Sequence, residues 1–502
     1  MPHPTDDIIR AMQSPSDEDQ KAIQDAYEFA EKAHGEEKRK SGEPYIVHPT
    51  TIAKTLATLG MDRDTIIAGI LHDTIEDTPV TADEIEQRFG KTVRFLVEGV
   101  TKLSKLKYRG VERHVESLRR LLVATASDIR VIIIKLADRL HNMETLKHVE
   151  PVEKRNRIAL ETREIYVPIA ERLGIGLMKA RLEDLAMQTL EPEKYAETER
   201  FLRERETAAK EPLGKAVNEL RRALAESDMR DFSTESRVKN VHSYSTKLVR
   251  KDNDPDKVYD ILAIRVIVPS VDDCYRVLGL VHKIWTPIPG RIKDYIAFPK
   301  PNGYRTLHTT VITPQKLIVE VQIRSEEMQQ KSKFGVAAHF LYKQPSSEKP
   351  GKKGFMAHLL PHLLRITKHD DPAAPAPRWL KELNVAAEEY GENAEFREAL
   401  AEDFFARRIF VFTPKGDVID LPIGATAVDF AYAVHTDLVD RMAGAKVNGK
   451  LVPLDTELKR GDMIEIQTKK QPSAPNKKWL DFAKTASARR HIRARVKKYN
   501  AN

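Results

Sequence analysis

Apolar residues recur three and four positions apart through the first part of the chain, which is the spacing of an amphipathic helix. Residues 17–34 and 115–146 show this period most clearly, and few strand signals interrupt it before about residue 195. A helix with one apolar stripe needs other elements to cover that stripe. The pattern therefore predicts an all-helical first domain over residues 1–195.

The pattern changes around residue 236, where short runs rich in β-branched residues alternate with helical ones. Residues 258–268, 306–313 and 316–324 have the length and composition of strands, whereas residues 271–285 have a helical period. Strands and helices that alternate along the chain are typical of an α/β domain. We place this second domain at residues 196–345.

A third region follows a stretch rich in Pro, Gly, Ser and charged residues, which predicts a linker with short helices over residues 346–405. Residues 408–422 then read as a hairpin, residues 427–438 as a helix, and residues 445–454 as a strand, a turn and a strand. This order predicts a small β-grasp-like domain over residues 406–470.

Composition limits the class of protein and the kinds of site. With 41% hydrophobic and 31% charged residues the chain is typical of a soluble globular protein, and it has neither a membrane-length apolar run nor a signal-peptide core. We therefore expect a cytoplasmic protein without membrane contact. Cys274 is the only cysteine, which excludes internal disulfides and zinc sites with two thiolates.

The chain has a net charge of +8, and this excess of positive charge is informative only at the end of the chain, where it clusters. Residues 471–502 gather Lys and Arg, and we expect a basic helical tail there. Clustered basic residues can bind nucleic acid, but a solvated helix face has the same composition, so both interpretations stay open.

Histidine and acidic residues interrupt the apolar pattern of the first domain at helical spacing. In ILHDTIEDT, residues 70–78, His72 lies four positions before Glu76, and Asp73 lies four before Asp77. On a continuous helix each of these pairs stacks on one face. Buried segments seldom carry such groups without partners, so this stretch is a candidate site.

Further candidate ligands lie in two other segments of the same domain. Asp138 and Asn142 are four positions apart and should face the same way, and His48 precedes a proline at a predicted helix start. Two imidazoles and two carboxylates suit Mn, Fe, Zn or Mg. A metal ion in such a site can activate water. Glu76 and Asp77 would orient or deprotonate that water. Three other histidines are interpreted as packing or surface residues: His34, His141 and His148.

The second domain carries a candidate nucleotide site. A basic run precedes a strand in which Asp260 is an isolated acid, and a period of two places Ile318, Glu320 and Gln322 on one face of another strand. Two acids on neighbouring strands within a ring of cations suit Mg²⁺-assisted transfer from ATP. A solvated basic face remains the alternative, because a basic run by itself is usually a solvated face. The basic run supplies Arg237, Lys239, Ser243 and Lys247.

The segment from residue 289 to residue 310 adds cations and an aromatic residue to this candidate site. Tyr304 follows an Asn-Gly pair, and an aromatic ring in such a position can stack on a base. The other residues of the segment that we assign to the site are Arg291, Lys293, Lys300 and His308.

Three motifs of the first domain, RKSGEPYIVHP, GILHDTIEDT and KLADRLHNM, resemble the HD hydrolase domain of the RelA/SpoT homologues, the bacterial stringent-response enzymes. The resemblance implies hydrolysis of the 3′-pyrophosphate from (p)ppGpp, which gives GDP or GTP. The residues that it implies are His48, His72, Asp73 and Asp138 for a Mn²⁺ ion, Glu76 and Asp77 for activating water, and Arg39, Lys40 and Asn142 for the nucleotide.

The second domain resembles the (p)ppGpp synthetase domain of the same family, which implies pyrophosphate transfer from ATP to the 3′-hydroxyl of GDP or GTP. The RIKD at residues 291–294 matches the charge pattern of bifunctional members. The implied roles are Asp260 for Mg²⁺, Glu320 as base, Arg237, Lys239, Ser243 and Lys247 for ATP phosphates, Tyr304 for stacking on guanine, Asn302 and His308 for the acceptor pocket, and Arg291, Lys293 and Lys300 for further nucleotide contacts.

This chain departs from the family's usual GRPKxxYSIYKK motif at several positions. Ser236 and Val238 replace its Gly and Pro, and His242 and Ser245 replace its two Tyr residues. The replacement of Gly matters if that position needs a positive φ.

The third region resembles a TGS domain, which in long family members contacts deacylated tRNA on the ribosome. His435 occupies the matching position for that contact. A β-grasp domain that acts only as an internal regulator is the alternative. Long members continue into helical, zinc-finger and ACT domains, so we expect a long-type member without the last two, either naturally short or truncated.

Three functions are consistent with the sequence. The first is a bifunctional enzyme that makes and destroys (p)ppGpp, with the helices around residues 150–235 coupling the two activities. The second is a hydrolase whose weakened synthetase domain has become regulatory. The third is a tRNA- or ribosome-binding regulator with little catalysis, which would have no use for the catalytic acids.

Overall fold

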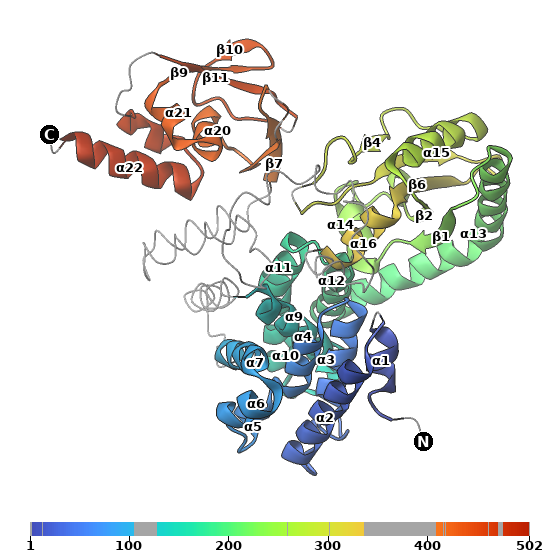
Figure 1. Ribbon diagram of the computed structural model, residues 1–502. Coiled ribbons are helices and arrows are strands. Elements are labelled where there is room, and N and C mark those ends of the chain that lie inside the picture. The colour runs from blue at the N-terminus through green and yellow to red at the C-terminus, as the bar shows by residue number, and fades with distance from the viewer. Residues whose placement is uncertain are drawn as a thin grey trace, which may run out of the picture. The chain divides into compact units, whose positions relative to one another are not determined.

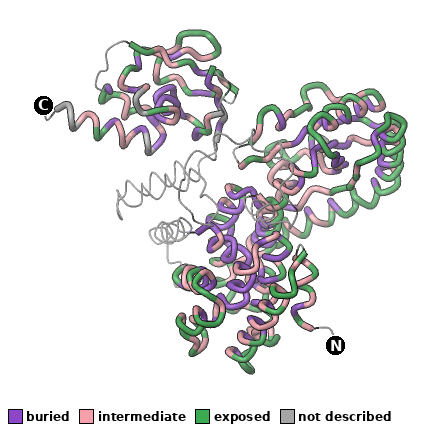
Figure 2. The backbone as a smooth tube through the Cα atoms, viewed as in Figure 1, coloured by how far each residue is buried: buried purple, intermediate pink, exposed green. Residues whose placement is uncertain are grey.

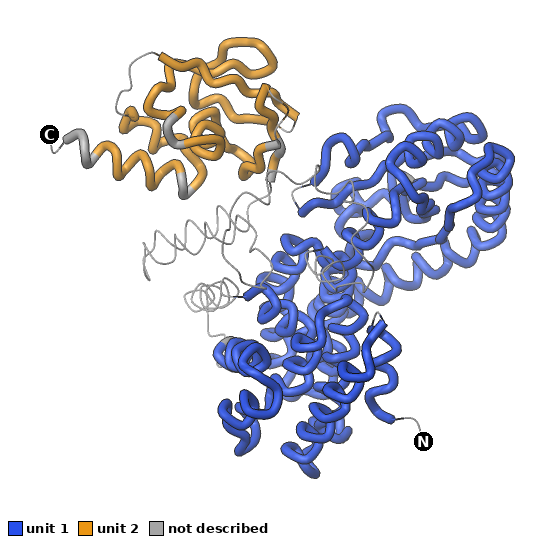
Figure 3. Tube along the Cα trace, viewed as in Figure 1, with its two compact units in different colours: residues 1–108, 124–376 blue, residues 109–123, 377–502 orange. Residues whose placement is uncertain are grey.

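The computed structural model describes residues 3–12, 14–104, 128–258, 260–300, 302–335, 408–414, 416, 418–459, 461–469 and 475–500. These residues belong to two compact units, drawn in Figure 3, of which unit 1 comprises residues 1–108 and 124–376 and unit 2 comprises residues 109–123 and 377–502. The predicted linker over residues 346–405 lies outside the described residues, as does the first part of the helical pattern at residues 115–146.

The N-terminal part of unit 1 is helical, as the sequence predicts (Figure 1). A π-helical turn at Thr162–Tyr166 joins two of its helices. The helices are α1 (Asp6–Ala11), α2 (Asp17–His34), α3 (Val47–Thr58), α4 (Arg63–Leu71), α5 (Thr74–Asp77), α6 (Ala82–Phe89), α7 (Lys91–Ser104), α9 (Ile129–Glu144), α10 (Val152–Glu161), α11 (Val167–Arg172), α12 (Gly176–Leu190) and α13 (Pro192–Glu226).

Local signals determine where these helices begin and end. Helix α2 begins with a capping box, in which Ser16 accepts from the amide of Asp19 and the Asp19 side chain accepts from the amide of Ser16. It ends at Gly35, whose φ of 54° suits glycine.

Helix α4 lies at the centre of the helical core. Each residue from Thr65 to Leu71 is buried, and the helix packs against α2, α3, α7 and α9. Figure 2 shows buried backbone concentrated along α4 and α9. Gly69 permits the close approach of α3, because a Cβ there would lie 2.4 Å from Leu56 Cδ1. This packing holds the two ends of α4 in fixed positions relative to α3 and α9.

The stretch at residues 70–78 is not the continuous helix that we expected. Helix α4 ends at Leu71, and α5 begins only at Thr74. Side chains replace the helical backbone bonds at the break: His72 Nδ1 bonds the carbonyl of Gly69 at 2.9 Å, and Thr74 Oγ1 donates to the carbonyl of Leu71 at 2.7 Å. The break buries His72 and leaves Glu76 exposed, so these two do not share a face.

The second part of unit 1 is α/β, also as predicted, and its six-stranded sheet has the order β1-β2-β6-β5-β3, with β4 beside β5. Strands β2 and β6 are parallel, and the other pairs are antiparallel. The elements are β1 (Ser233–Val238), α14 (Val241–Val249), β2 (Leu262–Val268), α15 (Val271–Ile284), β3 (Thr286–Pro287), β4 (Lys293–Asp294), β5 (Leu307–Ile312), β6 (Ile318–Ser325) and α16 (Glu326–Phe334).

The two faces of this sheet differ in character. Alternate residues such as Ile264, Val266 and Val321 are buried in one core with apolar residues of α13 and α15. The residues between them point to the opposite face, because successive side chains of a strand alternate. Polar and charged side chains of four strands therefore gather on that second face.

Unit 2 contains the hairpin, helix and strand pairs that the sequence predicts for a β-grasp-like domain. The predicted helix at residues 427–438 breaks at His435 into two, and Asn448 and Gly449 form the predicted turn with φ values of 53° and 80°. The elements are β7 (Arg408–Phe412), β8 (Val418–Pro422), α20 (Ala427–Val434), α21 (Thr436–Asp440), β9 (Met442–Val447), β10 (Lys450–Val452), β11 (Ile464–Thr468) and α22 (Ala486–Asn500).

Helix α20 is buried on two sides within unit 2. Phe430 packs with strand residues, whereas Ala427 and Ala431 pack with Ala488 and Ile492 of α22. Asp429 ties these parts together, because Oδ2 accepts from the amide of Thr426 while Oδ1 accepts from the amides of residues 484 and 485. The basic segment that we expected as a tail thus packs on α20.

Among the described helices of both units, none combines the length and the apolar character that a membrane crossing requires.

Two candidate active sites

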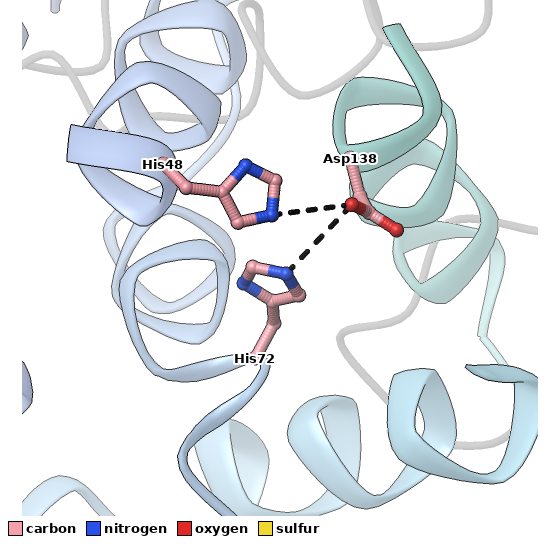
Figure 4. Close-up of side chains that lie close together, drawn as sticks. All are labelled: His48, His72 and Asp138. Atoms are coloured by element: carbon pink, nitrogen blue, oxygen red, sulfur yellow. Dashed lines mark ion pairs between the residues drawn. The ribbon is translucent and has the colours of Figure 1, made fainter. Parts of the chain in front are cut away.

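Three buried side chains from different helices converge in the helical part of unit 1. They are His48 from α3, His72 at the end of α4 and Asp138 from α9, and their ligand atoms all lie within 4.8 Å of one another (Figure 4). Asp138 Oδ1 lies 3.3 Å from His48 Nε2 and 4.0 Å from His72 Nε2. The sequence predicted this convergence from residues that are far apart along the chain.

The hydrogen bonds of His72 leave Nε2 available as a ligand. Nδ1 must be protonated, because its partner at 2.9 Å is the carbonyl of Gly69. Nε2 is buried and makes no hydrogen bond. Buried polar atoms are nearly always paired, so an orphaned imidazole nitrogen beside a carboxylate fits a metal ligand.

His141 determines the orientation of His48. Its Nδ1 accepts from Arg39 Nη1 at 2.9 Å, and His48 Nδ1 lies 2.7 Å from the same atom. Burial, and then the neighbouring His48 and Arg39, lower the pKa of His141 to about 4, so its ring is neutral. His48 Nδ1 must therefore donate to it, which leaves the lone pair of His48 Nε2 directed at Asp138.

The sequence analysis interpreted His141 as a packing or surface residue, and it did not anticipate the contacts of this buried ring with Arg39 and His48. His141 lies three positions after Asp138 on the same face of α9, and this spacing is the signal that could have found it.

Replacing His141 by Phe should weaken divalent metal binding about 10- to 100-fold, because the residue that orients His48 would no longer accept a hydrogen bond. Mn²⁺ titration of the full chain measures this directly. His148→Phe, which changes an exposed histidine just beyond the same helix, is the matched control. Equal affinities of the two variants would contradict the role of His141.

Asp73 lies beside the group of three. Its Oδ2 is 2.9 Å from His72 Nε2 and 3.6 Å from His48 Nε2, and it also accepts from the hydroxyl of Tyr45 at 2.7 Å. Burial opposes ionisation, but His72 and His48 hold the pKa of Asp73 well below its usual range. Asp73 is thus an ionised carboxylate against both imidazoles, as a fourth ligand would be.

Asp138 is held from its other side by a buried lysine. Lys135 Nζ lies 2.6 Å from Oδ2, and Asn142 Nδ2 donates to Oδ1. Burial opposes ionisation, but Lys135 and then His48 lower the pKa of Asp138. The predicted alignment of Asp138 with Asn142 is confirmed, and Lys135 is a functional contact that the sequence analysis missed.

The other predicted hydrolase residues surround this cluster. Arg39 Nη2 donates to Asn142 Oδ1 at 2.6 Å, so Arg39 reaches the cluster through both Asn142 and His141. Lys40 is exposed beside it. Glu76 and Asp77 are exposed on α5, and the hydroxyl of Tyr45 at 3.0 Å links Asp77 to Asp73.

The second candidate site lies on the polar face of the sheet. The strand register places Glu320 of β6 beside Ala263 of β2, which pairs with Arg237 of β1. Two residues further along β6, Gln322 pairs with Arg265 of β2 on one side and with His308 of β5 on the other. His308 in turn pairs with Lys293 of β4. Residues with the same parity share a face, so these cations surround Glu320.

Asp260 lies just before β2 and contacts two of the predicted lysines. Lys239 Nζ is 2.6 Å from Asp260 Oδ2, and Lys247 of α14 contacts the same oxygen. Burial and the nearby Lys239 lower the pKa of Lys247 to about 7. Ser243 lies one turn before Lys247 on the same helix.

A chain of hydrogen bonds leads from Glu320 to a buried arginine. His308 Nδ1 lies 3.2 Å from Glu320 Oε1, His308 Nε2 lies 3.1 Å from the hydroxyl of Tyr304, and Arg324 Nη2 donates to that hydroxyl at 3.0 Å. Gln322 also donates to Glu320. Burial opposes ionisation of Glu320, but His308 and Gln322 outweigh it and lower the pKa to about 2. Glu320 is therefore ionised near neutral pH.

The remaining predicted residues lie along the 291–304 segment. Lys300 Nζ is 4.9 Å from the ring centre of Tyr304, and Asn302 Nδ2 donates to the carbonyl of Glu171. Arg291 lies in the turn before β4, and Lys293 is exposed on β4. Sequence reasoning missed Arg265 and Arg324. Arg324 lies four positions after Glu320 on β6, and this even spacing was the available signal for it. Arg265 joins the site only through the pairing of β2 with β6, which places it beside Gln322.

Three family models match consecutive parts of the chain. An HD domain matches residues 26–176, the region found in RelA/SpoT proteins matches residues 236–347, and a TGS domain matches residues 409–468. Taken in order, these three regions are similar to the domains of RelA/SpoT proteins. The regions of the two candidate sites thus coincide with the family's first two domains.

Curated relatives of the RelA/SpoT family match most of the chain. It is 45% identical to the guanosine-3′,5′-bis(diphosphate) 3′-pyrophosphohydrolase of Aquifex aeolicus over 95% of the chain and 64% of that protein. It is 44% identical to the bifunctional (p)ppGpp synthase/hydrolase SpoT of Escherichia coli (96% and 65%), and 43% identical to the GTP pyrophosphokinase of Myxococcus xanthus (96% and 61%). The chain thus spans a little under two thirds of these relatives' length.

The departures from the RelA/SpoT motif fit the local structure. Ser236 pairs with Ile264 inside β1 and is not among the residues with positive φ, so this backbone does not need glycine. Val238 is also a regular strand residue, and His242 lies in the first turn of α14. These substitutions leave the cations around Asp260 and Glu320 in place.

The TGS region places His435 on the surface, at the end of α20. The Asp429 contacts connect α20 to the start of α22, which carries the basic residues of the chain's end.

Proposed function

We propose that the chain is a bifunctional stringent-response enzyme that hydrolyses (p)ppGpp to GDP or GTP and pyrophosphate, and that transfers pyrophosphate from ATP to the 3′-hydroxyl of GDP or GTP. The observation that carries the proposal is that one chain holds both a buried His-His-Asp cluster and a separate sheet face with two acids among cations. The names of the curated relatives include both activities.

In the hydrolase site, His48, His72, Asp73 and Asp138 would hold a divalent ion, which we propose to be Mn²⁺. Such an ion supplies Lewis-acid stabilisation of phosphoryl oxygens and activation of water. Asp77, which the Tyr45 hydroxyl links to Asp73, would take the proton of the attacking water, and Glu76 would assist it. The bond between phosphorus and the 3′-oxygen breaks, and the ribose oxygen leaves with a proton.

In the synthetase site, Glu320 would accept the proton of the attacking 3′-hydroxyl, and His308 and Gln322 hold its carboxylate in place. Arg237, Lys239, Ser243 and Lys247 would contact the phosphates of ATP, and Asp260 would hold Mg²⁺. Tyr304, Asn302, Lys300, Lys293 and Arg291 would line the guanine-nucleotide pocket. The β-phosphorus of ATP bonds to the 3′-oxygen as AMP leaves.

We also propose that unit 2 contacts deacylated tRNA on the ribosome, with His435 and the basic helix α22 as the contact. The exposure of His435 and the basic composition of α22 support this partner. Retention of deacylated tRNA by the chain, and its reduction in a His435→Ala variant, measure it.

Two assays on the purified chain test the enzymatic proposal. With ATP, GDP and Mg²⁺ we expect AMP and ppGpp, and with ppGpp and Mn²⁺ we expect GDP and pyrophosphate. Hydrolysis without any synthesis would instead establish the hydrolase with a regulatory synthetase domain. Absence of both reactions would contradict the proposal as a whole.

A further inference from the structure

Helix α14 has an unusual N-terminus. It begins at Val241, and its N-cap residue Asn240 makes no capping hydrogen bond with its own side chain. The cap comes instead from α12, a distant element of the chain. Asp184 Oδ1 accepts from the amide of His242 at 2.9 Å and from Asn240 Nδ2 at 3.3 Å.

This carboxylate fulfils two requirements of a helix N-terminus. It satisfies one of the amides that have no partner within the helix, and its negative charge faces the positive end of the helix dipole. Glu183, the preceding residue, adds a second acid at 3.6 Å from His242 Nδ1. Helix α14 has nine residues, so one such cap acts on a large fraction of it.

The same helix carries residues of the proposed ATP site. Ser243 lies one position after His242, and Lys247 reaches Asp260 from the next turn. On its other side, Tyr244 is buried against Met187 and stacks on Phe201. The position of Lys247 therefore depends on how α14 is seated on α12 and α13.

Asp184 lies outside the regions that match the HD and RelA/SpoT family models, which end at residue 176 and begin at residue 236. Helix α12 also packs against α9, which carries Asp138 of the hydrolase cluster. The backbone of Asp184 thus belongs to the helical part of unit 1, and its side chain forms hydrogen bonds with α14 in the α/β part.

We propose that Asp184 is a positioning residue for pyrophosphate transfer: by capping α14 from α12, it holds Ser243 and Lys247 against the phosphates of ATP. This inference rests on the proposed synthetase function. The carboxylate oxygen of Asp184 acts by accepting hydrogen bonds from the start of α14. Asp184 itself does not contact the nucleotide.

The test compares Asp184→Ala with Asp184→Asn in the full chain. Alanine removes the acceptor, so we expect kcat/KM for ATP to fall about tenfold, mainly through KM. Asparagine keeps an oxygen at the same place and is itself a good capping residue, so we expect it to stay within about threefold of the wild type. Gln188→Ala, on an exposed part of α12, is the matched control, and hydrolysis of ppGpp should be unchanged in all three variants.

Two outcomes would overturn the inference: an alanine variant with wild-type synthesis, or an asparagine variant that loses as much as alanine. A wild-type chain without synthesis would contradict the proposed function instead. Amide hydrogen exchange over residues 240–247 still examines the cap in that case. Exchange should speed up in Asp184→Ala and not in Asp184→Asn, and equal exchange in both would refute the cap.

Discussion

Replacing His72 by Ala lowers the rate of ppGpp hydrolysis by at least about 10³-fold, which corresponds to about 4 kcal/mol of transition-state stabilisation. The reason is geometric. His72 Nε2 is a buried nitrogen that makes no hydrogen bond, and it lies 4.0 Å from Asp138 Oδ1 and 2.9 Å from Asp73 Oδ2.

The same preparation of His72→Ala provides its own control. The synthetase face lies on the sheet and uses no atom of the cluster, so synthesis with Mg²⁺ should remain within about twofold of the wild type. Hydrolysis that survives in a variant with weakened metal binding would contradict the assignment of the cluster. Loss of both activities would indicate misfolding, which a melting curve would reveal.

Replacing Glu320 by Gln lowers synthesis by about 10³-fold, within the range expected when a general base is removed. Glutamine has nearly the same shape and its oxygen can still accept from His308, so the strand should be unchanged, although the amide NH2 cannot accept from Gln322. The lost property is the negative charge, which the structure maintains near neutral pH because His308 and Gln322 lower the pKa of Glu320 to about 2. Formation of AMP from ATP and GDP measures the effect.

Glu327→Gln is the matched control for this prediction, because Glu327 is a half-buried acid on α16, directly after β6, and pairs with Lys331. It should leave both activities unchanged. Synthesis by Glu320→Gln at the wild-type rate would show that another group takes the proton, and the role of base would then pass to a different residue of the polar face.

Sequence periodicity predicted several individual elements in both units. Helix α2, the strand pairs β7–β8 and β9–β10, and the three central strands β2, β5 and β6 lie where the pattern placed them. Periodicity failed where side chains compete with the backbone. The break between α4 and α5 depends on bonds that His72 and Thr74 make to nearby carbonyls, and these two residues have no effect on the apolar period.

The candidate sites divide in the same way. The spacing of Asp138 and Asn142 on one helix, and of Glu320 and Gln322 on one strand, could be predicted because local geometry alone determines which side chains share a face. The hydrogen bond between His48 and His141 joins residues 93 positions apart, and the capping of α14 by Asp184 joins residues 58 apart. No local period connects such residues.

The sequence by itself determined the order of an all-helical, an α/β and a β-grasp-like region, and it contained the histidines, acids and cations of both sites. Only the tertiary structure decided which imidazole nitrogen is available as a ligand, which carboxylate oxygen a lysine occupies, and which helix supplies the cap of another. The physical reason is that hydrogen bonds act over about 3 Å, so their partners are known only once packing has brought distant segments together.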